Sequence, residues 1–350
     1  MDNNINFVSI ILLTYNSALD LPECVPSLLS QTYGNFEIII VDNASSDGTV
    51  EFIHKNYPQL KLIEAGKNLG YPSGNNLGFE YARGNYVVVV NPDTVADSQW
   101  LTELIKPLDE DSSITATTSK IKIYYDTDKI NACGDISHYT GLTFCKGLHA
   151  PSDSFSQSEE IGAVAGGSFA IRREMLDYIK GFDSDFFLYM EDTDLSWRVR
   201  FAGGKLVYVP TSIIYHKFKL SIAAWKHFYL ERNRYMMLLK NLETKTLLLL
   251  LPGLVLTEIV TMGHATLNGP EYIRNKFKAY WWIVNNRNII FEHRKKTLAT
   301  KKISDKEFFQ LIEWRVPYEQ IIKNKTLLWC ADKLFNTAYR LHFTVAKRLI

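Results

Sequence analysis

The sequence is poor in cysteine and lacks the patterns of disulfide-stabilised, zinc-binding or secreted proteins. Its 350 residues include four cysteines, and no two of them have the spacing of a metal-binding pair. They are Cys24, Cys133, Cys145 and Cys330. We therefore expect reduced thiols in an intracellular protein. The N-terminal segment has no basic stretch followed by an apolar one, so no secretory signal is expected.

Long hydrophobic runs are also scarce. The most apolar stretch, 247–260, has 14 residues, whereas a helix needs roughly 20 to cross a bilayer. Pro252 and Gly253 interrupt this stretch, and Glu258 lies near its end. We expect a re-entrant or interfacial segment or a buried hairpin, and no spanning helix.

Two glycine-rich motifs are also absent, and each absence argues against a class of enzyme. The glycines of segment 68–78 do not follow the first predicted strand with the spacing of a dinucleotide fingerprint, which argues against hydride chemistry. A Gly-rich loop with Arg and Lys directly after that strand is also missing, which argues against a nucleotidyltransferase. No internal repeat is present.

Charge is balanced overall but divided along the chain. The formal net charge is +1. Residues 1–216 hold 15 Lys and Arg against 28 Asp and Glu, and residues 217–350 hold 24 against 10. An acidic front half can hold a divalent cation, and a basic, aromatic back half suits anionic lipid or an anionic substrate. The charge change predicts a boundary near residue 217.

The stretch 86–94 has the pattern of a central strand. Four consecutive valines follow Tyr86, and Asn91, Pro92 and Asp93 come directly after them. A continuous β-branched run of this kind is typical of a strand buried on both faces of an α/β sheet. Such a strand delivers Asp93 to the sheet edge where these folds bind ligands. Taken alone, the pattern is equally consistent with a solvated Asp that caps the next helix.

Strands and helices alternate through the front of the chain. Further strands are predicted at 7–13, 36–41 and 60–64, with helices at 19–31, at 50–56 and after a loop at 68–78. This order predicts the α/β class, with a doubly wound, nucleotide-binding sheet. Polar side chains follow three of the strands: Thr14 and Asn16, then Asp42 and Asn43, then Asn91 and Asp93.

A second acidic cluster stands behind the aromatic run 186–189. Glu191, Asp192 and Asp194 begin a predicted helix over 193–202. The helix dipole accounts for one carboxylate in a first turn, but not readily for three behind an apolar run. A carboxylate held there is placed to take a proton from an acceptor hydroxyl.

Segment 120–160 is polar and irregular. We expect a variable insertion that shapes acceptor specificity or, equally, a surface excursion. The sheet is predicted to resume over 161–172, where Gly166 and Gly167 allow close approach of the backbone to a ligand.

With these segments in view, residues 1–216 resemble a family 2 glycosyltransferase of the GT-A fold, and especially its rhamnosyltransferase-like branch. The matching segments are 8–16, 41–49, 68–78, 91–94, 166–172, 181–183, 191–198 and His216. The resemblance implies a Rossmann-like GT-A sheet with a helical, basic C-terminal extension over 217–350. It also implies an inverting, metal-dependent sugar transfer, with Mg²⁺ or Mn²⁺ as the cofactor.

The resemblance assigns roles to single residues. It gives Asp42 a contact with the nucleotide base, Asp93 the metal on the donor diphosphate, and Asp192 the part of catalytic base. Asn91 departs from the first Asp of the Asp-x-Asp motif, which puts metal ligation by Asn91 in doubt. Residues 71–73, Tyr-Pro-Ser, depart from the branch's usual Phe-Ala, which points to an altered sugar pocket.

The full set of expected site residues follows from the motifs and the resemblance together. The donor-binding set is Thr14, Tyr15, Asn16, Asp42, Asn43, Asn68, Gly70, Asn75, Asn91 and Gly167. The metal set is Asp93 and His216, although His216 fits a core or surface histidine equally well. The acceptor-side set is Glu191, Trp197 and Arg198, and for Arg198 an ion pair with Glu191 or Asp194 is the favoured alternative.

The back half carries amphipathic patterns. Apolar and aromatic residues at helical spacing predict helices over 222–241 and 327–349, the second with a basic rim. Trp281, Trp282 and the basic residues around 294–302 add to a surface that fits a membrane interface. A homodimer interface would use the same surface.

Together these features predict transfer of a sugar, with rhamnose favoured by the branch, from a dTDP- or UDP-linked donor. The acceptor is a glycan or a lipid-linked glycan of the cell surface, reached from the cytoplasmic side at the membrane, and no nucleic acid is involved. The alternative is a module that binds nucleotide sugar without turnover.

Overall fold

The structure is a computed structural model that describes residues 6–218 and 223–350. The chain forms two compact units, which are described separately. The first consists of residues 1–135, 145–199 and 204–219, and the second of residues 136–144, 200–203 and 220–350.

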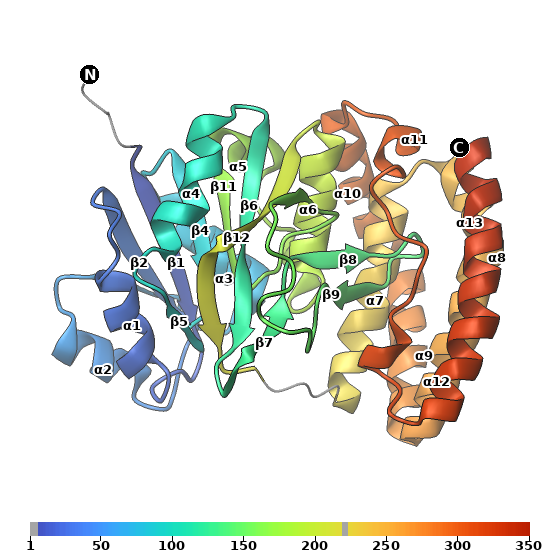
Figure 1. Ribbon diagram of the computed structural model, residues 1–350, viewed down its shortest axis with the longest axis horizontal. Helices are drawn as coiled ribbons and strands as arrows, with labels where there is room; N and C mark the ends of the chain where they lie inside the picture. Colours follow the sequence, from blue (N-terminus) through green and yellow to red (C-terminus); the bar gives the residue numbers. More distant parts are fainter. Residues whose placement is uncertain (1–5, 219–222) are drawn as a thin grey trace. The chain divides into compact units, whose positions relative to one another are not determined.

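A ten-stranded sheet is the centre of the first unit (Figure 1). Its main path runs β10, β12, β6, β11, β4, β1, β2, β3, while β5 pairs with β12 and β7 pairs with β6. The strands are β1 (Val8–Thr14), β2 (Phe36–Asp42), β3 (Lys61–Glu64), β4 (Tyr86–Val90), β5 (Thr94–Ala96), β6 (Ile114–Ile123), β7 (Asp126–Ala132), β10 (Glu159–Glu160), β11 (Ser168–Arg172) and β12 (Lys205–His216). Strands β8 (Asp135–Ser137) and β9 (Thr143–Cys145) form a separate two-stranded sheet.

The parallel register aligns the carboxyl ends of the first strands. Strand β1 pairs in parallel with β2 and with β4, so that Thr14 lies opposite Asp42 and Leu12 opposite Val90. The predicted strands at 7–13, 36–41, 60–64 and 86–90 are confirmed. The polar residues that follow them gather at one edge, as the sequence predicted.

Alternate residues of the central strands face two helical layers. The even positions of β1, such as Ile10 and Leu12, belong to one core cluster with α1 (Leu21–Leu29), α2 (Thr49–Asn56) and α4 (Trp100–Glu110). Odd positions face α3 (Gly70–Tyr81), where a Cβ on Gly78 would lie 2.6 Å from Ile11. Further along the chain are α5 (Arg173–Ile179), η1 (Ser184–Phe186) and α6 (Glu191–Phe201). The α/β class is confirmed.

The sheet is mixed rather than purely parallel. Strand β11 is antiparallel to both β4 and β6, and β5 is antiparallel to β12. Strand β6, which the sequence analysis did not predict, is a buried strand, because its hydroxyl side chains find internal partners. Thr117 donates to the Leu104 carbonyl at 2.8 Å, and Ser119 lies 2.9 Å from the Trp100 indole nitrogen.

Three local predictions were wrong. Segment 68–78 is mostly the helix α3 and not a loop. Segment 120–160 is not irregular, since it holds the end of β6 and the strands β7 to β10. Within 161–172 only β11 belongs to the sheet as a strand.

The second unit is mainly helical and also holds most of β8 and β9. Its elements are α7 (Ala224–Asn241), α8 (Thr244–Asn268), α9 (Pro270–Asn285), α10 (Arg287–Thr300), α11 (Asp305–Phe308), η2 (Tyr318–Gln320), α12 (Lys325–Ala331), η3 (Asp332–Asn336) and α13 (Thr337–Leu349), drawn in yellow to red in Figure 1. The predicted start of the first helix at Ile222 lies outside the described residues. The predicted helix 327–349 is a helical run with a π-helical segment at η3.

Helix α8 corrects the prediction made for 247–260. It runs unbroken through Pro252 for 25 residues, so the segment is neither short nor a hairpin. Gly253 explains the Pro-Gly pair, because a Cβ there would lie 2.6 Å from the Tyr139 hydroxyl. Among the described residues, α8 is the one helix that has the length and apolar composition to cross a bilayer, with a mean hydropathy of 1.9 over an 18-residue window.

Candidate functional site

Two hydrogen bonds hold the carboxylate at the end of β2. Asp42 is 2% exposed. Its Oδ1 accepts from the Thr14 hydroxyl at 3.1 Å, and its Oδ2 accepts from the Ser45 amide at 2.9 Å. This geometry orients the carboxylate at the sheet edge and leaves it lone pairs for a further donor such as a nucleotide base.

Asn43 ties the end of β2 to the start of α3. Its Oδ1 accepts from the Leu69 amide at 2.8 Å, and its Nδ2 donates to Asn68 Oδ1 at 3.1 Å. Asn68 Oδ1 also accepts from the Gly70 amide at 2.9 Å. The expected donor-binding residues Asn43, Asn68 and Gly70 therefore lie next to one another. Hydrogen bonds between their side chains and backbone amides hold the turn that leads into α3.

The other expected donor-binding residues differ in exposure. Tyr15 and Asn16 are exposed, and Asn16 accepts from the Ser46 amide at 2.9 Å. Asn75 is fully buried on α3; its Nδ2 donates to the Tyr71 carbonyl at 3.0 Å, and its Oδ1 has no protein partner. Burial on α3 places Asn75 away from direct contact with solvent, so a bound donor would have to displace neighbours to reach it.

Asp93 and His216 face one another at the end of the sheet. The Asp93 Oδ2 and the His216 Nε2 lie 3.1 Å apart, and the His216 Nδ1 lies 2.7 Å from Asn131 Oδ1. Burial alone would raise the pKa of Asp93, but the hydrogen bond and charge of His216 and the charge of Lys217 outweigh it, so that the pKa lies below its usual value. Asp93 is therefore ionised at neutral pH.

This arrangement fits a divalent cation. Both ring nitrogens of His216 face acceptor oxygens, so the ring either carries two protons or exchanges the proton facing Asp93 for a metal ion. Imidazole and carboxylate are ligands of Mn²⁺, and a histidine ligand commonly donates its other nitrogen to an oxygen, as His216 does toward Asn131. Asn131 lies on β7, and the sequence analysis missed it because that segment was read as irregular.

Asp192 is held by backbone amides. Its Oδ2 accepts from the Gly166 amide at 3.0 Å, and its Oδ1 accepts from the Thr193 amide at 2.7 Å. A Cβ on Gly166 would lie 2.7 Å from that Oδ2, so only glycine permits this approach. Burial raises the pKa of Asp192, against the opposing effect of these amides. A carboxylate with a raised pKa and a fixed orientation suits a general base.

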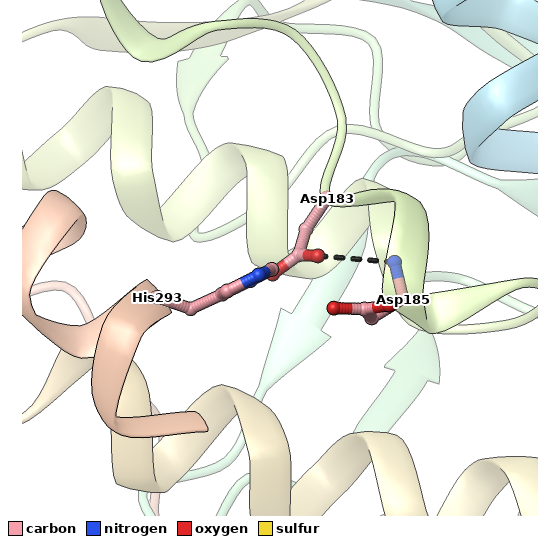
Figure 2. A group of neighbouring side chains, drawn as sticks. All are labelled: Asp183, Asp185 and His293. Carbon is pink, nitrogen blue, oxygen red and sulfur yellow. Dashed lines mark hydrogen bonds between the residues drawn. The ribbon is translucent and has the colours of Figure 1, made fainter. Parts of the chain in front are cut away.

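The turn that leads to Asp192 is held in an unusual backbone conformation. Phe187, Tyr189 and Met190 have φ values of 61°, 68° and 67°. Non-glycine residues in this region are uncommon and cluster at functional sites. The preceding 3₁₀ turn is capped by Asp183, whose Oδ1 accepts from the Asp185 amide at 3.1 Å (Figure 2); His293, drawn in the same figure, belongs to the second unit.

The acceptor-side set is only partly accessible. Trp197 is fully buried, which removes it from contact with an acceptor. Arg198 donates from Nε to Asp194 Oδ2 at 2.8 Å and from Nη1 to the Gly181 carbonyl at 2.7 Å, so it is a buried structural cation. Glu191 is 7% exposed, its Oε2 has no protein partner, and burial raises its pKa well above the usual value. The Arg198 Nη2 likewise has no hydrogen-bond partner, so Glu191 and Arg198 each keep one polar atom that a ligand could contact.

One side chain contacts both halves of the site. The Tyr71 hydroxyl lies 3.1 Å from Asn91 Oδ1 and 2.9 Å from the Gly166 carbonyl. Asn91 stands two residues before Asp93, and the Gly166 amide holds Asp192. The expected metal-binding and base residues are therefore neighbours of the same hydroxyl, and Gly167 adjoins them through its carbonyl, which accepts from the Asn91 amide at 3.2 Å.

Comparison with known proteins finds similarity to glycosyltransferases. Residues 9–179 match the family model described as Glycosyl transferase family 2. An uncharacterized protein, y4gI, of Sinorhizobium fredii is 29% identical over 222 residues, covering 60% of this chain and 24% of that protein. An uncharacterized glycosyltransferase of Haemophilus influenzae is 31% identical over 136 residues, covering 38% of this chain and 41% of that protein.

A third relative is covered over most of its length. N-acetylglucosaminyl-diphospho-decaprenol L-rhamnosyltransferase of Mycobacterium tuberculosis is 28% identical over 238 residues, covering 59% of this chain and 75% of that protein. This chain thus spans less than half the length of the two relatives named before it.

Two solved structures share the fold. Staphylococcus aureus TarS 1–349 in complex with UDP has a TM-score of 0.54 at 16% identity, covering 98% of this chain and 92% of that one. The mannosyltransferase PcManGT of Pyrobaculum calidifontis, in complex with GDP-Man and Mn²⁺, has a TM-score of 0.51 at 16% identity, covering 99% and 87%. Residues 9–179 thus match glycosyl transferase family 2, and the sheet that they form is of the GT-A type.

Proposed function

We propose that this chain is an inverting, metal-dependent glycosyltransferase. It moves a sugar from a nucleotide-diphosphate donor to a hydroxyl of a glycan or lipid-linked glycan in cell-surface polysaccharide synthesis. The observation that supports the proposal is that the Tyr71 hydroxyl contacts both Asn91, two residues before the Asp93 that pairs with His216, and Gly166, whose amide holds Asp192. The relative from Mycobacterium tuberculosis, named as a rhamnosyltransferase, supports rhamnose as the first sugar to test.

The residues divide the reaction between them. Asp192 accepts the proton of the acceptor hydroxyl, whose oxygen then bonds to the anomeric carbon while the bond to the diphosphate breaks and its electron pair leaves with the nucleotide. Asp42 faces the base, and Asp93 with His216 would hold the cation. A bound divalent cation supplies charge neutralisation for the departing diphosphate. Because one ligand is imidazole, we expect Mn²⁺ to support transfer better than Mg²⁺.

The test is transfer from a panel of dTDP-, UDP- and GDP-sugars to lipid extracts, with Mn²⁺ or Mg²⁺. The variants are Asp93→Ala, Asp192→Asn and, as a matched surface control on α5, Asp177→Asn. We expect one donor to turn over with inversion at the anomeric carbon, seen by NMR. Both site variants should lose activity, while Asp192→Asn still binds nucleotide. A protein that binds nucleotide sugar but never transfers it would instead be a binding module.

The second unit supports a site of action at a membrane surface, and we extend the proposal to that location. One face of α8 exposes Leu248, Leu251, Val255 and Ile259, each at least half exposed, at helical spacing. Helix α9 adds Trp281, which is 68% exposed. Residues 217–350 carry 24 Lys and Arg against 10 Asp and Glu. An apolar face with a basic surround is the composition of a helix bound to an anionic membrane.

Flotation with vesicles tests this location. We expect the protein to float with vesicles that contain anionic lipid and less with neutral ones, and Val255→Glu to weaken flotation severalfold without loss of folding. The exposed Tyr125→Glu in the first unit is the control. If the protein ignores both vesicles and runs as a dimer that Val255→Glu dissociates, the apolar face is a subunit interface.

A further inference from the structure

Tyr71 is fixed at its backbone to the turn that carries the general base. Its amide donates to the Phe187 carbonyl at 2.7 Å. Gly70 before it has φ of 78°, and a Cβ there would lie 2.5 Å from the same carbonyl oxygen. The start of α3 is therefore seated directly on the left-handed turn that precedes Asp192, and the tyrosine side chain leaves from a fixed point.

The ring and hydroxyl of Tyr71 are also fixed. The ring packs edge-on against Phe182, with centroids 6.0 Å apart. The hydroxyl reaches the side chain of Asn91 at 3.1 Å and the carbonyl of Gly166 at 2.9 Å. These two contacts belong to different strands' ends, after β4 and before β11. The Asn91 amide also donates to the Gly167 carbonyl at 3.2 Å, so the Tyr71 hydroxyl adds a side-chain link to an existing backbone link.

The phenol acts as a donor and not as a base. Burial, and then the charges of Glu191, Asp192 and Asp93, raise its pKa well above the usual value, so its proton stays in place. The single phenol proton is shared between the Asn91 and Gly166 oxygens or donated to one of them at a time, and loss of the hydroxyl removes the donor from both part-buried oxygens.

We propose that Tyr71 is a positioning residue that sets the donor edge at Asn91 and the Asp192 carboxylate in fixed relation, through its hydroxyl. On the donor side it orients the Asn91 amide, which stands where the resemblance expected a carboxylate. On the acceptor side it holds the carbonyl of Gly166, and the amide of the same residue, in the preceding peptide unit, orients Asp192. The inference rests on the proposed function, and it names the residue that joins its two halves.

Removal of the hydroxyl has two separable consequences. Asn91 loses a partner, which weakens nucleotide binding. The Gly166 carbonyl loses its contact with the hydroxyl, so Gly166 can shift and the hydrogen bond from its amide to Asp192 weakens. Because that hydrogen bond lowers the pKa of Asp192, its weakening raises the pKa and moves the acid limb of the activity profile to higher pH. Asp135, Cys145, Glu191 and Tyr71 are the titratable groups that face Asp192 in the first unit, and Tyr71→Phe leaves the charge of each of the other three unchanged.

The experiment measures nucleotide binding and the pH profile in four variants of the full chain. UDP, dTDP and GDP, each with Mn²⁺, are titrated calorimetrically, and transfer is measured from pH 5 to 9. We expect Tyr71→Phe to weaken binding about threefold to tenfold, the range of one lost hydrogen bond, and to move the acid limb upward. Asn91→Ala should change binding alone, and Gly166→Ala should change the acid limb alone. Tyr33→Phe, which loses a buried hydroxyl that donates to Asn6 at 2.6 Å, should match the wild type in both.

A double variant separates positioning from general damage. If Tyr71 acts through Asn91, Tyr71→Phe with Asn91→Ala binds nucleotide no more weakly than Asn91→Ala alone. Additive losses, or a Tyr71→Phe protein equal to the wild type in both measurements, overturn the inference and leave the proposed function standing. A wild-type protein that binds none of the three nucleotides overturns both the proposed function and the role of Tyr71. A wild-type protein that binds nucleotide but never transfers a sugar overturns the proposed function alone. In that case the binding measurements on the single and double variants still decide whether Tyr71 acts through Asn91.

Discussion

The His216 Nε2 and the Asp93 Oδ2 lie 3.1 Å apart although 123 residues separate them in the chain. The backbone sets this meeting, because His216 is opposite Thr94 in the antiparallel pairing of β12 with β5. The end of β12 thus returns to the loop after β4 and brings together the two residues that we propose as metal ligands.

We expect substitution at this pair to act on metal affinity. His216→Gln keeps a polar group but removes the imidazole ligand, so the Mn²⁺ concentration that gives half-maximal transfer should rise by about tenfold or more. Asp93→Asn should abolish metal-stimulated transfer. The exposed His54→Gln is the control, and it should follow the wild-type metal titration. Equal metal titrations for His216→Gln and wild type would show that His216 is no ligand.

Asn131 should affect the metal affinity of the same site, because it contacts the ring nitrogen of His216 that faces away from Asp93. Its Oδ1 lies 2.7 Å from the His216 Nδ1, so it fixes the ring and leaves Nε2 toward Asp93. Asn131→Ala should weaken Mn²⁺ affinity by about 10-fold to 100-fold, the usual effect of losing a partner behind a metal ligand. Asn131→Asp, which keeps an acceptor, should restore most of that affinity in the same titration. An unchanged affinity in Asn131→Ala would exclude this role.

The pH profile reports Asp192. Burial raises the pKa of its carboxyl, and the general base must be ionised, so activity should fall on the acid side at a higher pH than an ordinary aspartate would give. Asp192→Asn should reduce kcat by about 10²-fold to 10⁴-fold while nucleotide binding persists. An acid limb at the ordinary aspartate pKa, or a fully active Asp192→Asn, would contradict the assignment.

The buried ion pair of α6 should carry stability rather than catalysis. Asp194 is fully buried and lies 2.8 Å from Arg198, which is 7% exposed. Asp194→Asn leaves a buried cation without its counter-charge and should lower the free energy of unfolding by about 3 kcal/mol. The exposed pair of Arg173 and Asp177 has the same spacing, and Asp177→Asn should change that free energy by less than about 0.5 kcal/mol. Denaturant unfolding of both variants makes the comparison.

The apolar strands could be predicted because each is an uninterrupted run of apolar residues that is visible in the sequence. Uninterrupted β-branched runs, as at 86–90, mark buried parallel strands, and the polar residues that follow them mark the ligand edge. This is why the residues from Thr14 to Asp93 at that edge were found from the sequence. Strand β6 was missed for the opposite reason, since its buried threonines and serines are satisfied only by partners that the fold brings to them, such as Trp100.

Helix α3 was misread because glycine signalled a loop. Gly70, Gly74 and Gly78 stand four residues apart, which is the period of one helix face, and that spacing was available in the sequence. These glycines let α3 lie close against the side chains of β1. A Cβ on Gly74 would lie 2.5 Å from Leu13, and one on Gly78 would lie 2.6 Å from Ile11. Tyr71 could not be found as a link between Asn91 and Gly166, because that depends on three segments meeting.

The left-handed turn before Asp192 has a consequence for how this chain can change. Each of Phe187, Tyr189 and Met190 has a positive φ, a backbone conformation that costs a non-glycine residue about 1–3 kcal/mol. Glycine would remove that cost, but at Met190, which is 8% exposed, it would also remove a buried side chain. The chain therefore keeps three large side chains in a strained segment directly before Asp192, where each of them can be changed only at the expense of either packing or backbone conformation.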